Sequence, residues 1–166
     1  KAAQLMLTTG PFLEVNAGKS ISGADVKSTS GTVNLEVKVQ CTDWIDIDRL
    51  QVLVNGKQEP QYNFTRASHP DYFGKGVVKF ARTIEIKLKE DAHLIVVVMG
   101  ENSTLKTGYG TSTNASLKPC AYINPIWVDV DGGGFKANGD TLGWDLPVGR
   151  QDPKKIRALL KAKGLN

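Results

Sequence analysis

The stretch Thr32-Val33-Asn34-Leu35-Glu36-Val37-Lys38-Val39-Gln40 decides the fold, because its apolar and polar side chains alternate without a break. Successive side chains of a β-strand point to opposite faces, so the alternation predicts a strand with one face in a core and the other in water. A second stretch, Leu94-Ile95-Val96-Val97-Val98-Met99, is apolar throughout. A short continuous run predicts a strand that is covered on both faces. Together the two stretches indicate an all-β module.

Shorter segments extend this pattern along the chain. Further strands are expected over residues 12–15, 44–54, 77–80, 83–89 and 126–130. Within 44–54 the apolar positions change parity near Asp48-Arg49, which predicts a bend or a β-bulge. Asn55-Gly56 follows directly. This dipeptide favours positive φ at both residues and therefore predicts a type I′ hairpin turn.

The segments between the strands are rich in Gly, Pro, Ser, Thr and Asn. Loops are expected over 18–31, over 57–76 with room for one edge strand, and over 101–120. A structureless loop of about 20 residues is unusual in a compact domain and is often functional. Near the C-terminus, Asp152-Pro153 predicts the start of a short helix, with Asp as N-cap and Pro at the first helical position.

Six or seven strands with turns and long loops predict the fold class. We expect an all-β chain that forms an immunoglobulin-like antiparallel β-sandwich with a short C-terminal helix. A jelly roll is the alternative. The 166 residues suffice for one domain with a substantial core. Residues 1–166 are therefore expected to form a single β-sandwich domain, with 151–166 as a helical tail.

Composition and charge narrow the class of function. The net charge is +4, and the 21 Lys and Arg residues are scattered apart from a basic cluster at 154–163. Nucleic-acid binding requires a denser basic patch and is not expected. No apolar run approaches the ~20 residues that span a bilayer, so no membrane span is expected. The chain starts at Lys1 without a signal peptide, which predicts a fragment of a longer protein or a processed mature chain.

The ionisable and nucleophilic residues form no complete catalytic motif. His69 and His93 lie outside HxH and HExxH arrangements, and neither a GxSxG elbow nor a P-loop occurs. The chain is therefore not expected to be an enzyme. Cys41 and Cys120 lie outside any CxxC motif. We interpret them as two small buried hydrophobic residues, with a disulfide bond as the alternative.

One segment has the spacing of a calcium-binding loop. Residues 129–140 place Asp129, Asp131 and Gly134 at positions one, three and six of a twelve-residue loop, and Asp140 at position twelve. Gly133, at position five, offers no side-chain oxygen. The alternative is a Gly-rich turn that closes the last strand without a metal. The candidate calcium ligands are Asp129, Asp131, Asn138 and Asp140.

Aromatic residues offer a different kind of site. Four of them lie in the two segments expected to be long loops, where exposed rings could contact a carbohydrate or a cell surface. The alternative is that these rings pack on their own domain. Trp44 and Trp127 are expected to pack against the sandwich. The candidate ligand or interface residues are Tyr62, Tyr72, Phe73 and Tyr109.

Four fragments together resemble one family. They are residues 8–13 (TTGPFL), 43–56 (DWIDIDRLQVLVNG), 91–100 (DAHLIVVVMG) and 124–132 (NPIWVDVDG). In this order and spacing they resemble the C-terminal β-sandwich of CehA/McbA-type metallohydrolases of the PHP superfamily. The resemblance covers residues 8–147. Thr9 and Gly133 depart from the family pattern, which usually has Asn and Asp at these places.

The resemblance implies an accessory, non-catalytic domain. The His and Asp metal ligands of the PHP active site have no counterpart in this chain, so no activity carries over to these residues. The implied partner is an upstream catalytic domain, with 1–9 as the junction and the 101–120 loop presented towards the substrate. The alternative function is a carbohydrate or cell-surface binding module. Polar loops with three glycosylation sequons, at Asn63, Asn102 and Asn114, favour an extracytoplasmic location.

Overall fold

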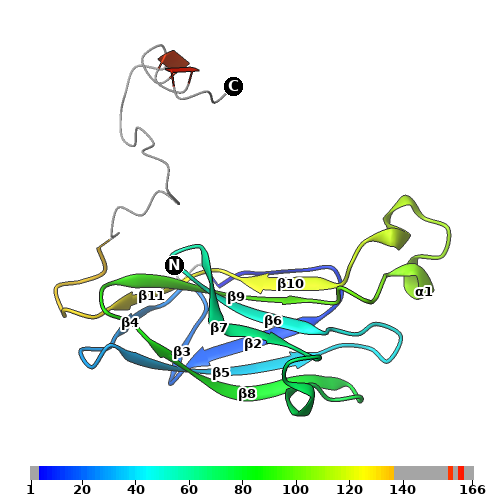
Figure 1. Cartoon of the computed structure of the whole chain (residues 1–166), viewed down its shortest axis with the longest axis horizontal. Helices are drawn as coiled ribbons and strands as arrows, with labels where there is room; N and C mark the ends of the chain where they lie inside the picture. The colour runs from blue at the N-terminus through cyan, green and yellow to red at the C-terminus, as the bar shows by residue number, and fades with distance from the viewer. Residues whose placement is uncertain (1–3, 137–156, 159–160, 163–166) are drawn as a thin grey trace.

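Two β-sheets pack face to face and enclose an apolar core in the computed structural model, which describes residues 4–136, 157–158 and 161–162 (Figure 1). The smaller sheet has the strand order β3-β2-β5-β8. Its strands are β2 (Phe12–Ala17), β3 (Ser20–Ile21), β5 (Thr32–Gln40) and β8 (Val78–Lys87). The all-β sandwich predicted from the sequence is confirmed.

The larger sheet is built around β9 (Ala92–Met99). On one side β9 pairs with β6 (Arg49–Val54), which pairs with β7 (Lys57–Thr65). On the other side its two halves pair with β10 (Cys120–Ile123) and β11 (Ile126–Asp129). Two short strands complete the sheet: β1 (Met6–Thr8) is antiparallel to β10, and β4 (Asp25–Lys27) is parallel to β11.

The distribution of strands between the sheets is the immunoglobulin-like one. Strands β2, β5 and β8 occupy the places of A, B and E, and β6, β9 and β10 those of C, F and G. The strands outnumber the six or seven predicted, partly because four short ones, β1, β3, β4 and β10, carry too few residues to show a periodicity. Residues 6–8 of the predicted junction are thus part of the sandwich.

The alternating stretch forms β5 as predicted. Val33, Leu35, Val37 and Val39 are buried, and the polar residues between them point outward. β9 differs from its prediction, because only one of its faces is buried. Leu94, Val96 and Val98 are fully buried, whereas residues 95, 97 and 99 remain partly exposed on the outer face of the larger sheet.

Several segments expected to be loops contain regular structure. β3 and β4 lie within 18–31, and β7 occupies nine residues of 57–76. The 101–120 segment contains a one-turn helix, α1 (Lys106–Tyr109), and a 3-10 turn, η2 (Thr113–Ser116). Leu105, between β9 and α1, is buried with Cys41 and Ile45 in a small second cluster. This burial anchors the segment, so the expectation of a structureless loop is wrong.

The details of β6 and its turn were predicted in part. The strand begins at Arg49, so 44–48 is not strand, and the irregularity in its pairing with β7 lies between Gln51 and Leu53. Asn55 and Gly56 have φ angles of 52° and 75°, which confirms positive φ at both turn residues. The segments 77–80 and 83–89 belong to one continuous strand, β8.

The C-terminal helix predicted for 151–166 lies mostly outside the described residues, of which 157–158 and 161–162 are helical. The described part of the chain has no helix of the length and apolar character needed to cross a membrane.

Candidate functional site

The turn that follows β11 is organised by the carboxylate of Asp129. Its Oδ1 accepts a hydrogen bond from the backbone N–H of Gly132 at 2.6 Å, and its Oδ2 accepts one from Gly134 at 3.0 Å. Gly132 and Gly134 have φ angles of 82° and 88°, a region that favours glycine. The Gly-rich sequence therefore lets the chain turn its amides back onto Asp129.

A second buried carboxylate, Asp91, joins this turn from the residue before β9. Its Oδ1 accepts from the N–H of Val130 and its Oδ2 from that of Lys136, each at 2.8 Å. One oxygen each from Asp91, Asp129 and Asp131 lies within 4.8 Å of the others. The structure thus brings together two predicted ligands and adds Asp91. No local motif could identify Asp91, because it reaches the turn only through the pairing of β9 with β11.

The third carboxylate, Asp131, is exposed and lies beside a lysine. Its Oδ1 accepts from the N–H of Gly133 at 2.7 Å, and its Oδ2 lies 3.3 Å from Nζ of Lys136. The hydrogen bond from Gly133, followed by the interaction with Lys136, lowers the pKa of Asp131 below its ordinary value of 3.8. Because both side chains are well exposed, this ion pair contributes little to stability.

These carboxylates already have partners within the protein. Four backbone amides donate to Asp91 and Asp129, and Lys136 supplies a positive charge beside Asp131. Calcium requires six to eight oxygen ligands. The three carboxylates could provide some of them, while the predicted ligands Asn138 and Asp140 lie outside the described residues. A calcium ion at this turn therefore stays a prediction.

Two of the four candidate aromatic residues are buried, which agrees with the alternative that these rings pack on their own domain. Tyr62 lies in β7 with 8% of its surface exposed, and its hydroxyl accepts from the N–H of Lys87 at 2.9 Å. Phe73 is 6% exposed and packs against Phe80 at a centroid distance of 5.4 Å. Both rings belong to the core because the segment expected to be a loop contributes a strand and its following turn to the sandwich.

The other two candidate aromatic residues, Tyr72 and Tyr109, differ in how far they are exposed. Tyr72 lies in the short 3-10 turn η1 (Pro70–Tyr72), is half-buried against Phe64, and is covered by the guanidinium of Arg82. Tyr109 in α1 is 44% exposed. Trp44 is also exposed, and its ring packs so close to Gly108 that a Cβ there would lie 2.4 Å from it. The four predicted residues therefore do not form one exposed platform.

Both cysteines are free thiols. Cys41 is buried, and its Sγ donates to the carbonyl oxygen of Ile45 at 3.4 Å. Burial raises the pKa of the Cys41 thiol to about 11. Cys120 is half-buried at the start of β10. The interpretation as a small buried hydrophobic residue therefore holds for Cys41, whereas Cys120 is only partly buried.

The outer surface of the larger sheet carries an apolar patch, which we name the apolar face. Strand pairing places Leu7, Tyr122 and Val97 in one row across β1, β10 and β9. Leu7 and Tyr122 are 42% and 41% exposed. The patch was not predicted, because β1 and β10 were not recognised as strands. The members of the apolar face are Leu5, Leu7, Ile95, Val97, Met99, Tyr122 and Trp127.

The edge of the apolar face at β6 is polar. Arg49 on β6 forms an ion pair with Glu101 and donates to Oδ1 of Asn63 at 3.0 Å. At the other end Trp127 packs against Phe135, with ring centroids 4.9 Å apart. An apolar centre with a polar rim is the composition typical of a protein interface.

Comparisons with known proteins identified no relative of this chain. A scan against family models, a search of curated proteins and a search of solved structures each found no match for this chain. Inference about function therefore depends on the residues and their geometry.

Proposed function

We propose that this chain is a non-catalytic accessory β-sandwich that packs through its apolar face on a larger metal-dependent hydrolase domain of the PHP type. The resemblance of residues 8–147 to the sandwich appended to such hydrolases supports the choice of partner. The observation that carries the proposal is the apolar face itself, since it gives the sandwich a surface suited to a second domain.

Exposed apolar area on the sandwich has a free-energy cost in water. Each Å² of apolar surface removed from water stabilises a complex by about 25 cal/mol before the costs of association. Large contiguous apolar patches on a soluble domain mark interaction sites. Leu7, Val97 and Tyr122 form such a row on a rigid sheet, so a partner can cover them without reordering the backbone.

The first test is the coding sequence upstream of the codon for Lys1. The proposal expects a domain there with clustered His and Asp metal ligands. A gene that begins at Lys1, or an upstream domain without such a cluster, contradicts it.

The second test uses surface variants of the chain in a binding measurement with that upstream domain. We expect Leu7→Asp and Tyr122→Asp to weaken binding at least tenfold, because each places a charge in the apolar face. Phe12→Asp is the matched control, since Phe12 is 51% exposed but lies on β2 of the other sheet. Equal binding by all three variants would contradict the proposed surface.

A further inference from the structure

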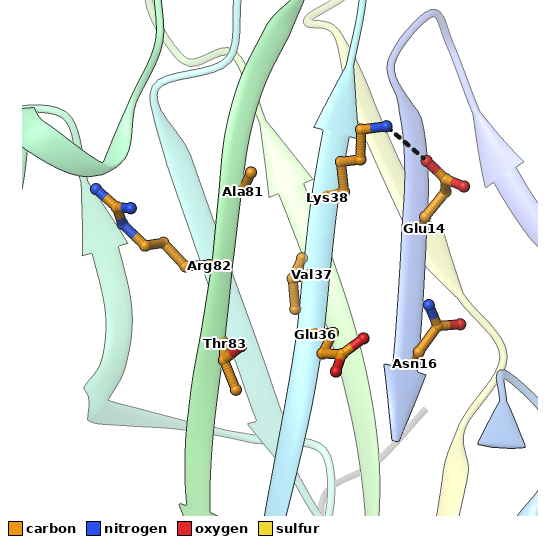
Figure 2. A pocket seen from close by; sticks show the side chains of 8 residues that line it. All are labelled: Glu14, Asn16, Glu36, Val37, Lys38, Ala81, Arg82 and Thr83. Carbon is orange, nitrogen blue, oxygen red and sulfur yellow. Dashed lines mark ion pairs between the residues drawn. The ribbon is translucent and has the colours of Figure 1, made fainter. Parts of the chain in front are cut away.

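The outer surface of the smaller sheet differs in kind from the apolar face. Polar side chains from β2, β5 and β8 line a shallow hollow of about 460 Å³ on it, as Figure 2 shows. Strand register places Asn16, Glu36 and Thr83 in one row and Glu14, Lys38 and Ala81 in the next. We name the polar face by its members: Phe12, Glu14, Asn16, Glu36, Lys38, Gln40 and Thr83.

Much of the hydrogen-bonding capacity of the polar face is unfilled. The side chains of Asn16, Glu36 and Gln40 make no hydrogen bond to any residue in the described part of the chain. Glu14 and Lys38 are 3.8 Å apart, at the long limit of an ion pair (Figure 2). Amide and carboxylate groups of this kind can donate to and accept from hydroxyl groups of a ligand.

An exposed aromatic ring adjoins this polar surface. Phe12 continues the outward side of β2 from Glu14, and it pairs across the strands with Gln40, which pairs with Val78. Phe12 and Val78 are both exposed. The face therefore offers an apolar end followed by rows of donors and acceptors along the same strands.

The charge on this surface points to a neutral ligand. Glu14 and Glu36 are offset in part by Lys38, whereas the guanidinium of Arg82, at the rim of the hollow, is turned towards Asp71 and Tyr72. A polyanion or a polycation would need a surface of one sign. The mixture of an aromatic ring with bidentate carboxylate and amide groups instead matches a sugar chain, whose rings have an apolar side and whose edges carry hydroxyl groups.

From these observations we infer that the polar face binds a neutral, extended oligosaccharide. The sugar chain lies along the strands. One sugar ring stacks on Phe12, and hydroxyl groups of the chain form hydrogen bonds with Asn16 and Glu36. Because the side chains stand on paired strands, the backbone needs no reordering on binding. The site lies on the sheet opposite the apolar face, so it is independent of the proposed packing on a second domain.

The test is calorimetry of the chain with hexasaccharides of β-1,4-linked glucose, xylose and mannose. We expect binding of at least one of them, with at least tenfold weaker binding by Phe12→Ala and by Glu36→Ala. Tyr109→Ala and Tyr122→Ser are matched controls and should bind like the unaltered chain, because these exposed rings lie outside the polar face. Circular dichroism checks that each variant is folded.

Three results would overturn the inference. The first is no binding of any neutral hexasaccharide at millimolar concentration. The second is binding that survives Phe12→Ala and Glu36→Ala but is lost in Tyr109→Ala, which would place the site at α1. The third is preference for an anionic oligogalacturonate over the neutral chains. None of these results bears on the apolar face, which Tyr122 variants test separately.

Discussion

The thiol of Cys41 shows how burial sets the chemistry of a single residue. Cys41 packs with Ile45 and Leu105, and this apolar environment raises its pKa to about 11. The thiolate is the reactive form of cysteine. At pH 8 the fraction of Cys41 thiolate is about one in a thousand, given a pKa three units higher.

We therefore expect selective labelling of the two cysteines. At pH 8 iodoacetamide should modify Cys120 in the folded chain and modify Cys41 only after denaturation, as measured by peptide mass spectrometry. Since the folded-state pKa of Cys41 is raised from 9.0 to about 11, its contribution to stability is present below pH 9 and is lost as the pH rises towards 11. Rapid labelling of Cys41 in the folded chain would contradict this picture.

Asp131 gives a second prediction at the scale of the residue. Removal of the neighbouring ammonium by Lys136→Met should raise the pKa of the Asp131 carboxyl towards 3.8, as measured by NMR titration. A lowered folded-state pKa stabilises the fold above the unfolded-state value, and the effect is lost as the pH falls through the lowered pKa. The hydrogen bond from Gly133 remains in the variant, so the return should be partial. No change in the midpoint would show that Lys136 has no influence.

Local spacing in the sequence accounts for some of the residues that lie together, and sheet pairing accounts for others. Asp129 and Asp131 meet because they are two positions apart on a turn, whereas Asp91 joins them only through sheet pairing. Tyr62 and Phe73 were candidates for exposure because they lie in a segment that was expected to be a loop. Their rings are buried by contacts with distant strands, which local composition does not report.

At the scale of elements, the join between β9 and the 101–120 segment depends on a close backbone approach. A Cβ at Gly100 would lie 2.1 Å from the carbonyl oxygen of Asp46 and 3.2 Å from Cγ of Pro119. Gly100→Ala must therefore shift backbone, and we expect destabilisation of about 1–3 kcal/mol from overpacking. The measurement is urea unfolding.

Gly76→Ala is the matched control for that variant. No atom of the described residues lies within 4 Å of a Cβ built at Gly76, so we expect Gly76→Ala to change the stability of the chain by less than about 0.5 kcal/mol. Equal stability of the two variants would contradict the close approach of Asp46 to Gly100.

The turn after β11 carries the calcium prediction. Binding of calcium to the folded state must stabilise it. If the turn binds calcium, Tm should therefore rise in millimolar calcium and fall on addition of chelator. Asp129→Asn should remove most of this calcium-dependent increment, with Lys19→Gln as a control at the surface. An unchanged Tm in calcium would leave the turn explained by its backbone amides and Lys136 alone.

The long alternating strand β5 was predictable from the sequence, whereas the short strands were not. Nine residues of β5 show a period of two clearly, whereas β3 has two residues and β4 has three. β7 was missed as a full strand because Pro60 lies within it; Pro is tolerated there since β7 is an edge strand. The prediction for β9 was wrong for a different reason. Its uniformly apolar sequence indicated burial on both faces, but the outer face is only partly buried.

At the scale of the whole molecule, the two outer faces of the sandwich have opposite characters. The apolar face lies over β1, β10 and β9, and the polar face lies over β2, β5 and β8. The α1 segment and the Asp129 turn lie at opposite ends of the sandwich (Figure 1). We expect a second domain to cover the apolar face and leave the polar face open to a sugar chain.

Hydroxyl-radical footprinting of the natural full-length protein tests this assignment most directly. Leu7, Tyr122, Phe12 and Tyr109 provide a balanced set of probes, because their exposed fractions in this chain are similar, between 41% and 51%. We expect Leu7 and Tyr122 to be protected when the proposed second domain is present, while Phe12 and Tyr109 are modified as readily as in the 166-residue chain. Free modification of Leu7 and Tyr122, or protection of Phe12 in their place, would contradict this assignment.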